Sequence, residues 1–163
     1  MRINVIPPIY LADQHLVAEY REIKMLPKMF LRSLKSKRGL REYGGEYTLN
    51  RGHGKSLYNK FGFIEKRFQQ LLEEMHSRNF KTNHDILDLS GIQEEFFGDY
   101  MPTEEAIRIN IERILLRIND KHEWYLYYGK SVDWSKFYGE LKLLKRTTND
   151  KRTICKDSKR EGH

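Results

Sequence analysis

The chain has 163 residues, of which 33% are charged and 39% hydrophobic, with a formal net charge of +7. Its single cysteine, Cys155, excludes an internal disulfide and a cysteine-rich zinc site. No apolar run approaches membrane-spanning length, and residues 1–8 lack a signal-peptide layout, so an intracellular protein is expected. The basic balance favours a polyanionic partner such as nucleic acid. We predict one domain over residues 1–141 and a basic, mobile tail over 142–163.

The first element predicted is an extended arm, because Pro7 and Pro8 prevent a helix there. A helix follows from about Asp13 to about Ser36, with a kink or break near Pro27 and with Asp13 as its N-cap. Leu16 and Tyr20 mark its buried face. A polar face carries His15, Ala18, Glu19 and Glu22, which suits either a ligand or a solvated surface.

Two further helices are predicted after a long loop over residues 39–55. One runs from about Ser56, as N-cap, to about Ser77. Short helical turns are expected at 84–89 and 92–97. The last main helix begins after Thr103, an N-cap followed by acidic residues. Its apolar stripe includes Ile107, Ile111, Ile114, Leu115 and Ile118.

Two features of the last third suit nucleic acid. Arg113, Arg117 and Lys121 lie four residues apart and form a basic ridge, which could face phosphates or pair with the neighbouring Glu112 and Asp120. The segment from Trp124 to Lys130 holds four aromatic residues, which could stack on bases or cap the core.

These pieces together resemble one family, the pyrimidine-dimer DNA glycosylases with abasic-site lyase activity, the dimer-specific endonuclease V type. The matching segments are Arg2-Ile3-Asn4, Asp13-Gln14-His15-Leu16, Ala18-Glu19-Tyr20-Arg21-Glu22, Gly52-His53, Gly98-Asp99-Tyr100 with Pro102, and Trp124-Tyr125 followed by Tyr127-Tyr128-Gly129-Lys130. The resemblance implies a compact all-α domain of three main helices, with the N-terminal arm threaded among them.

The resemblance also implies a mechanism. The N-terminal α-amine, here that of Met1, attacks C1′ of the 5′ nucleotide of the dimer, a Schiff base forms, and β-elimination cuts the strand. Its reference pKa near 7.7–8.0 leaves a useful neutral fraction at pH 7. Glu22 is the catalytic carboxylate. No cofactor and no metal are expected, and the partner is damaged double-stranded DNA bound by a monomer.

Other residues are expected at the DNA by the same resemblance. The basic ones are Arg2, Arg21, Lys28, Arg113, Arg117, Lys121 and Lys130, and the others are Gln14, His15, Tyr20, His53, Tyr125 and Tyr127. Leu126 stands where the family has a lysine, and Lys28 follows an apparent two-residue insertion. A non-catalytic DNA-binding protein on the same scaffold is the alternative, and a metal-dependent nuclease ranks last.

Overall fold

The computed structural model describes residues 2–139 and divides the chain into two compact units, Met1–Lys130 and Ser131–His163. The described part of the second unit is short. In it residues 134–139 are helical, and the Asp133 carboxylate accepts a hydrogen bond from Lys136 N–H at 3.1 Å. Met1 and the predicted tail, 142–163, lie outside the described residues.

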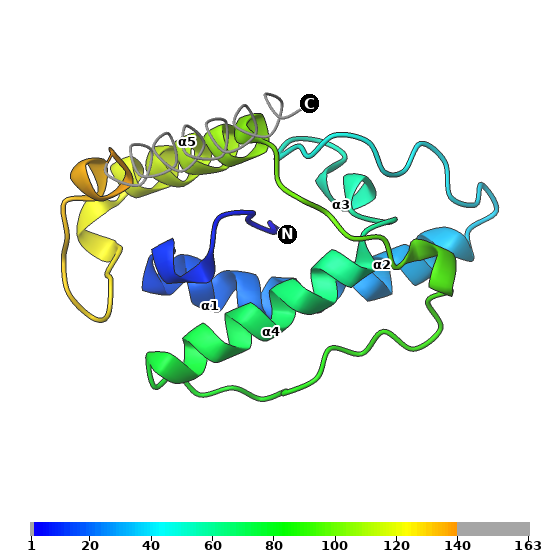
Figure 1. The fold of residues 1–163 in the computed structure, drawn as a ribbon, viewed down its shortest axis with the longest axis horizontal. Coiled ribbons are helices and arrows are strands. Elements are labelled where there is room, and N and C mark those ends of the chain that lie inside the picture. The colour runs from blue at the N-terminus through cyan, green and yellow to red at the C-terminus, as the bar shows by residue number, and fades with distance from the viewer. Residues whose placement is uncertain (1, 140–163) are drawn as a thin grey trace, which may run out of the picture. The chain divides into compact units, whose positions relative to one another are not determined.

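The first unit is all-α, as predicted (Figure 1). Its helices are α1 (Asp13–Glu22), α2 (Met25–Leu34), α3 (His53–Ser56), α4 (Phe61–Ser77) and α5 (Glu104–Asp120). Short 3-10 turns are η1 (Pro8–Tyr10), η2 (Glu94–Phe96) and η3 (His122–Trp124). Only two isolated β-bridges and no strand occur in the described residues. No helix there is long and apolar enough to cross a bilayer.

The expected first helix is two helices, because the chain breaks after Glu22 rather than at the proline. Ile23 and Lys24 form the turn between α1 and α2. Pro27 then lies in the first turn of α2, where a missing N–H costs no intrahelical hydrogen bond. The predicted break is confirmed, and its position is corrected.

The buried faces follow the predicted apolar spacing. Leu16 and Tyr20 of α1 are at most 3% exposed, and so are Phe68 of α4 and Ile114 of α5. Thr103 caps α5 as predicted, since its hydroxyl accepts from Ala106 N–H at 3.1 Å. Between α1 and α4 on one side and α5 on the other runs the N-terminal arm (Figure 1).

Three local predictions were wrong. Asp13 is not the N-cap of α1, since Ala12 holds that position and the Asp13 carboxylate binds groups outside its own helix. Ser56 ends α3 instead of capping α4, and its hydroxyl donates to His53 O. Residues 84–89 are not helical. Asp13 has tertiary partners, and Ser56 lies in a different turn, so neither side chain caps the helix that the sequence suggests.

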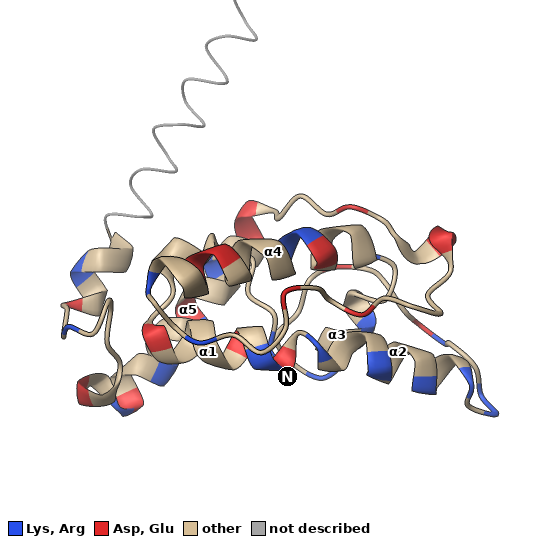
Figure 2. Cartoon of the chain, turned by 90° about the horizontal axis from the view of Figure 1, so that it is seen from below, with Lys and Arg blue, Asp and Glu red and all other residues tan. Residues whose placement is uncertain are grey.

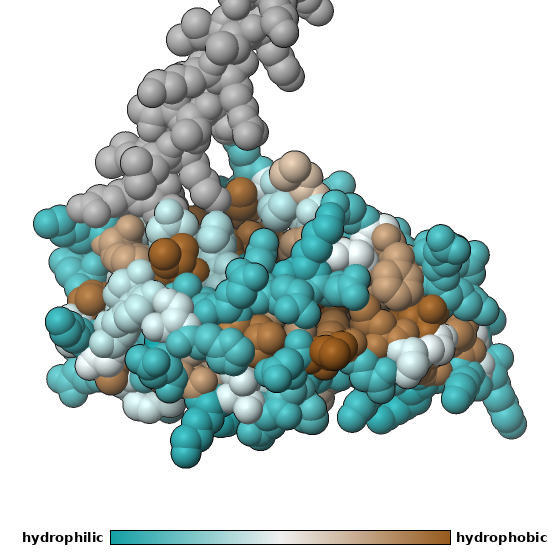
Figure 3. Space-filling view, turned by 60° about the horizontal axis from the view of Figure 1, so that its bottom comes forward, coloured by the Kyte–Doolittle hydropathy of each residue, from teal (hydrophilic) through white to brown (hydrophobic). Residues whose placement is uncertain are grey.

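Charge is segregated along the first unit. Blue bands of lysine and arginine follow α2 and the loop after it (Figure 2). Lys28, Arg32 and the run from Lys35 to Arg38 are part of this strip. On another face, apolar patches are separated by polar side chains (Figure 3).

Candidate functional site

The arm is held by side chains rather than by a neighbouring strand. Arg2 N–H donates to Glu22 Oε2 at 2.8 Å, and Ile3 N–H donates to His53 Nε2 at 2.8 Å. Asn4 N–H donates to Glu19 Oε1 at 3.0 Å. An extended chain must pair its backbone donors when it is buried. Here the donors are paired by side chains from α1 and α3.

The next residues of the arm are held by α5. Val5 N–H and Ile6 N–H both donate to Asn110 Oδ1, at 2.8 and 3.3 Å. Asn110 is fully buried, and its amide group donates to Asn4 Oδ1 at 2.7 Å. Tyr47 adds a hydrogen bond to Ile3 O at 2.7 Å. Three helices therefore fix the path of five consecutive residues, 2–6.

A buried ion pair lies behind the arm. Arg67 of α4 donates to both carboxylate oxygens of Glu19, at 2.8 and 2.9 Å, and to Ile6 O at 2.6 Å. The two side chains are 2% and 1% exposed. The remaining acceptor capacity of Glu19 is filled by Asn4, so the pair meets the condition under which buried charges are tolerated. We call Asn4, Glu19, His53, Arg67 and Asn110 the arm clamp.

The contacts of His53 define its protonation. Nε2 accepts from Ile3 N–H, so Nδ1 carries the proton and donates to Thr48 O at 2.5 Å. Burial lowers the pKa of His53 and outweighs the opposing effect of the Thr48 hydrogen bond. Both ring nitrogens therefore serve the protein interior, and contact of His53 with DNA stays a prediction.

A cleft of about 310 Å³ opens where the arm, α1 and α5 meet. Its volume lies at the small end of ligand sites. The side chains around it that carry chemistry are those of Arg2, Gln14, His15, Glu22, Arg117 and Tyr125, with Trp124 at its edge. The structure thus brings together residues that are more than 100 positions apart in the chain.

Two arginines and two carboxylates line the cleft, and because Glu19 is already paired with Arg67, Arg2 and Arg117 outnumber the remaining carboxylate, Glu22. Burial, followed by repulsion from Arg117 and Arg113, lowers the pKa of Arg2, and only the attraction of Glu22 and Tyr47 opposes this. Arg117 is exposed and has no acidic ion-pair partner among the described residues. Glu112, the neighbour proposed as an alternative partner, pairs instead with Arg108 at 2.7 Å. Such a site favours an anionic ligand.

His15 has an unusual position in this cleft. Its ring stacks on Tyr125, with centroids 4.6 Å apart, and neither ring nitrogen has a hydrogen-bond partner. Burial, with added repulsion from Arg2 and Arg117, lowers the pKa of His15 to about 4. His15 is therefore neutral at pH 7 and carries one donor and one acceptor that no group in residues 2–139 uses.

The aromatic segment forms a small hairpin. Tyr127 N–H donates to Lys130 O at 2.7 Å, and Lys130 N–H donates to Tyr127 O at 3.0 Å. We call residues 124–130 the aromatic hairpin. Trp124 is 58% exposed and Tyr125 only 8%, so one ring faces solvent and the next is buried, while stacking of this segment on bases stays a prediction.

The remaining predicted DNA contacts lie outside the cleft. Tyr20 is buried, and its hydroxyl bonds His84 O at 2.9 Å. Tyr127 donates to Ile9 O, and Arg113 donates to Asn50 Oδ1 at 2.9 Å. The other four are exposed basic side chains, namely Arg21, Lys28, Lys121 and Lys130. No structural finding tests whether any of these residues binds DNA.

A second cleft, of about 590 Å³, lies at the end of α5 and shares Trp124 with the first. Its lining residues, 120–124, are consecutive in the chain, so it follows a bend of the backbone instead of joining distant elements. No group of three or more histidine, cysteine or acidic side chains that could hold a metal occurs in the described residues.

Sequence reasoning missed the arm clamp. It placed Glu19 on a polar face of α1 that suits either a ligand or a solvated surface, whereas the side chain is buried in the interior and 1% exposed. One signal was available, because Arg67 interrupts the apolar stripe of α4 between Ile64 and Leu71, where a charged residue needs a buried partner. Asn110 similarly lies within the apolar stripe of α5.

Residues 1–88 match the model of a family described as pyrimidine dimer DNA glycosylase. The match contains the arm, α1, α2, α3 and α4, and so the four clamp residues Asn4, Glu19, His53 and Arg67 together with Glu22. The resemblance seen in the sequence is confirmed by this match. Because the match covers more than half of the 163 residues, the chain belongs to the pyrimidine dimer DNA glycosylase family.

Proposed function

We propose that the protein is a bifunctional glycosylase and abasic-site lyase for pyrimidine dimers in duplex DNA, with the α-amine of Met1 as nucleophile and Glu22 as the catalytic carboxylate. One observation carries the proposal. Arg2 N–H donates to Glu22 Oε2 at 2.8 Å, so the residue that follows Met1 is bound directly to Glu22 in the electropositive cleft.

The arm clamp supports this role for the start of the chain. A nucleophile must be held in register with the group that assists it, and orientation can lower a barrier by several kcal/mol. The α-amine of Met1 is three covalent bonds from Arg2 N, so an arm with fixed backbone limits its distance from Glu22. The buried Glu19–Arg67 pair supplies that rigidity.

The proposed reaction uses the α-amine of Met1 as nucleophile and Glu22 for charge stabilisation and proton transfer. The neutral α-amine attacks C1′ and forms an N–C bond, while the glycosidic bond breaks and the base leaves with its electron pair. Loss of a proton from nitrogen and opening of the sugar give the Schiff base. Removal of a C2′ proton then expels the 3′ phosphate by β-elimination. Glu22 stabilises the cationic sugar and transfers these protons.

The basic residues suit the charged backbone of the substrate. Arg2 and Arg117 in the cleft would face phosphates next to the lesion, and the α2 strip would extend the attraction along the duplex. A pyrimidine dimer pairs poorly, which lowers the cost of moving a nucleotide out of the stack.

The decisive experiment is borohydride trapping in EDTA with a duplex that contains one dimer or one abasic site. We expect a covalent complex whose mass map places the link at the first residue of the chain. Glu22→Gln should lower strand cleavage by about 10²–10⁴-fold and keep DNA binding. Glu65→Gln, on an exposed position of α4, is the matched control.

Four results would count against the proposal. Trapping that persists after the N-terminal amine is blocked would remove Met1 from its role. Undiminished cleavage by Glu22→Gln would remove Glu22. DNA binding without trapping or cleavage would favour a non-catalytic DNA-binding protein, and a requirement for magnesium would favour a metal-dependent nuclease.

A further inference from the structure

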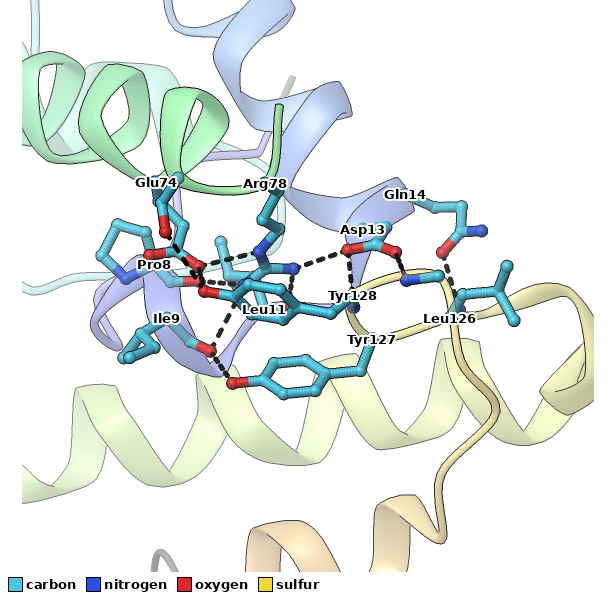
Figure 4. A network of polar contacts seen from close by, with 12 residues as sticks. Pro8, Ile9, Leu11, Asp13, Gln14, Glu74, Arg78, Leu126, Tyr127 and Tyr128 are labelled. Carbon is cyan, nitrogen blue, oxygen red and sulfur yellow. Dashed lines mark hydrogen bonds and ion pairs between the residues drawn. The ribbon is translucent and has the colours of Figure 1, made fainter. Parts of the chain in front are cut away.

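Two consecutive residues of α1 hold the aromatic hairpin. Gln14 donates through Nε2 to Trp124 O at 2.6 Å and accepts from Leu126 N–H through Oε1 at 3.0 Å. Asp13 N–H donates to Leu126 O at 2.8 Å. Both polar ends of one amide side chain are therefore used on the backbone of the same hairpin. Figure 4 shows the contact between Gln14 and Leu126.

The Asp13 carboxylate accepts hydrogen bonds from the tip of the same hairpin. Gly129 N–H donates to Oδ2 at 2.8 Å, and Tyr128 N–H donates to Oδ1 at 3.2 Å. Oδ1 also accepts from Arg78 at 2.8 Å (Figure 4). Tyr128 has a φ of +49°, a strained region for a residue with a side chain, so its conformation needs such support.

Arg78 connects the hairpin to the rest of the fold. It is 8% exposed and donates to Leu11 O at 2.9 Å and to Glu74 at 2.7 Å. Its guanidinium lies 5.0 and 4.6 Å from the ring centroids of Tyr127 and Tyr128. A cation over the faces of two rings is attracted by both, so Arg78 holds the tip of the hairpin against the fold.

The hairpin forms a wall of the cleft that contains Glu22. Trp124 and Tyr125 line the cleft, and Tyr125 stacks on His15. Gln14 and Glu22 are eight residues apart on α1, a rise of about 12 Å along the helix axis. A rigid helix thus sets the separation between the anchor of the aromatic wall and the proposed catalytic carboxylate.

We propose that Asp13 and Gln14 are positioning residues for lesion recognition, because they fix Trp124 and Tyr125 at a set distance from Glu22. The inference rests on the proposed function and adds a consequence that the chemistry alone does not have. A dimer presents bases on which aromatic rings can stack, whereas an abasic site presents none. Loosening the hairpin should therefore reduce dimer incision more than abasic-site incision.

The test compares Gln14→Met with wild type on matched duplexes in EDTA. Methionine keeps the length of the side chain and removes both hydrogen bonds. We expect kcat/KM for the dimer to fall by about tenfold more than for the abasic site, since one lost hydrogen bond is worth about 1 kcal/mol or more. Gln70→Met, at an exposed position of α4, is the control and should leave the ratio unchanged.

A physical readout accompanies the kinetics. The chain has two tryptophans, so Trp134→Phe leaves Trp124 as the only indole fluorophore. In that background Gln14→Met should lower the fluorescence anisotropy of Trp124. Asp13→Asn, which replaces a shared acceptor by an amide, should change the anisotropy and the incision ratio in the same direction.

The inference is overturned if dimer and abasic-site incision fall by the same factor, or if the anisotropy of Trp124 does not change. Equal losses with unchanged anisotropy would mean that Gln14 only contacts DNA. If the wild-type protein forms no trapped complex, the proposed function fails separately. The anisotropy and the ratio of affinities for dimer-containing and undamaged duplex would then still decide whether Gln14 positions the hairpin.

Discussion

The arm clamp and the cleft wall differ in how their polar groups are satisfied. In the clamp, Glu19, Arg67 and Asn110 are buried and bonded to one another or to the backbone of the arm. On the cleft wall, His15 has two nitrogens without a partner, and Arg117 has no acidic partner among the described residues. Side chains that are paired in the interior hold the arm in place, whereas side chains without interior partners remain available to a ligand.

The largest effect is expected in the arm clamp, at Arg67. Arg67→Met leaves the Glu19 carboxylate buried without its counter-charge, and we expect a loss of about 3–5 kcal/mol in the free energy of unfolding. Urea denaturation measures this. The double variant Glu19→Gln/Arg67→Met should recover part of the loss, because no unpaired charge remains. A double variant as unstable as the sum of the single variants would show that the two side chains are not coupled.

The next largest effect is expected at His15 of the cleft wall, in the pH dependence of the free energy of unfolding. Its pKa of about 4 in the folded protein lies below the ordinary value of 6.5, so the unfolded chain binds the proton more readily. Neutral His15 therefore makes its full contribution to the free energy of unfolding above pH 6.5. This contribution, about 3 kcal/mol in total, is lost as pH falls towards 4.

His15→Gln should flatten the pH dependence of the free energy of unfolding over this window. His76→Gln, at an exposed position of α4, controls for the loss of a histidine. If both variants retained the wild-type slope between pH 4 and 6.5, His15 would not be the group whose titration destabilises the fold.

The smallest effect on stability is expected at Arg117. Its role in the cleft is tested instead by the salt dependence of DNA binding. Arg117→Gln should change the free energy of unfolding by less than about 0.5 kcal/mol and should reduce the slope of log K against log salt by about one. Arg108→Gln removes an arginine of the same helix that pairs with Glu105 and Glu112. A loss of salt dependence in Arg108→Gln as large as in Arg117→Gln would mean that general charge, not the cleft, attracts DNA.

Much of the fold could be predicted because apolar spacing is a local property. The predicted stripe of α5 is read from apolar residues three and four apart, and its members Ile111, Ile114 and Ile118 are buried. The predicted cap at Thr103 is also found. The same reading failed for Asp13 and Ser56. Each suits a helix N-terminus locally, and each has instead a partner or place that its own helix does not supply.

The site residues also divide into those that local sequence predicts and those that depend on a tertiary partner. Residues that combine a characteristic motif with a helical register, such as His15 and Glu22, were predicted from the sequence and lie in one cleft. The roles of Asn4, Arg67 and Asn110 were not predicted. Each of these side chains bonds a partner on another element, and that partner cannot be identified from the local sequence.

The sequence by itself determined the all-α class, the apolar faces of the main helices and the family. Only the tertiary structure decided that Glu19 is an interior anchor while Glu22, one turn later, faces the cleft. The physical reason is that a buried carboxylate is stable only beside a cation and donors, and Arg67 and Asn4 reach Glu19 only after α1, α4 and the arm have packed together.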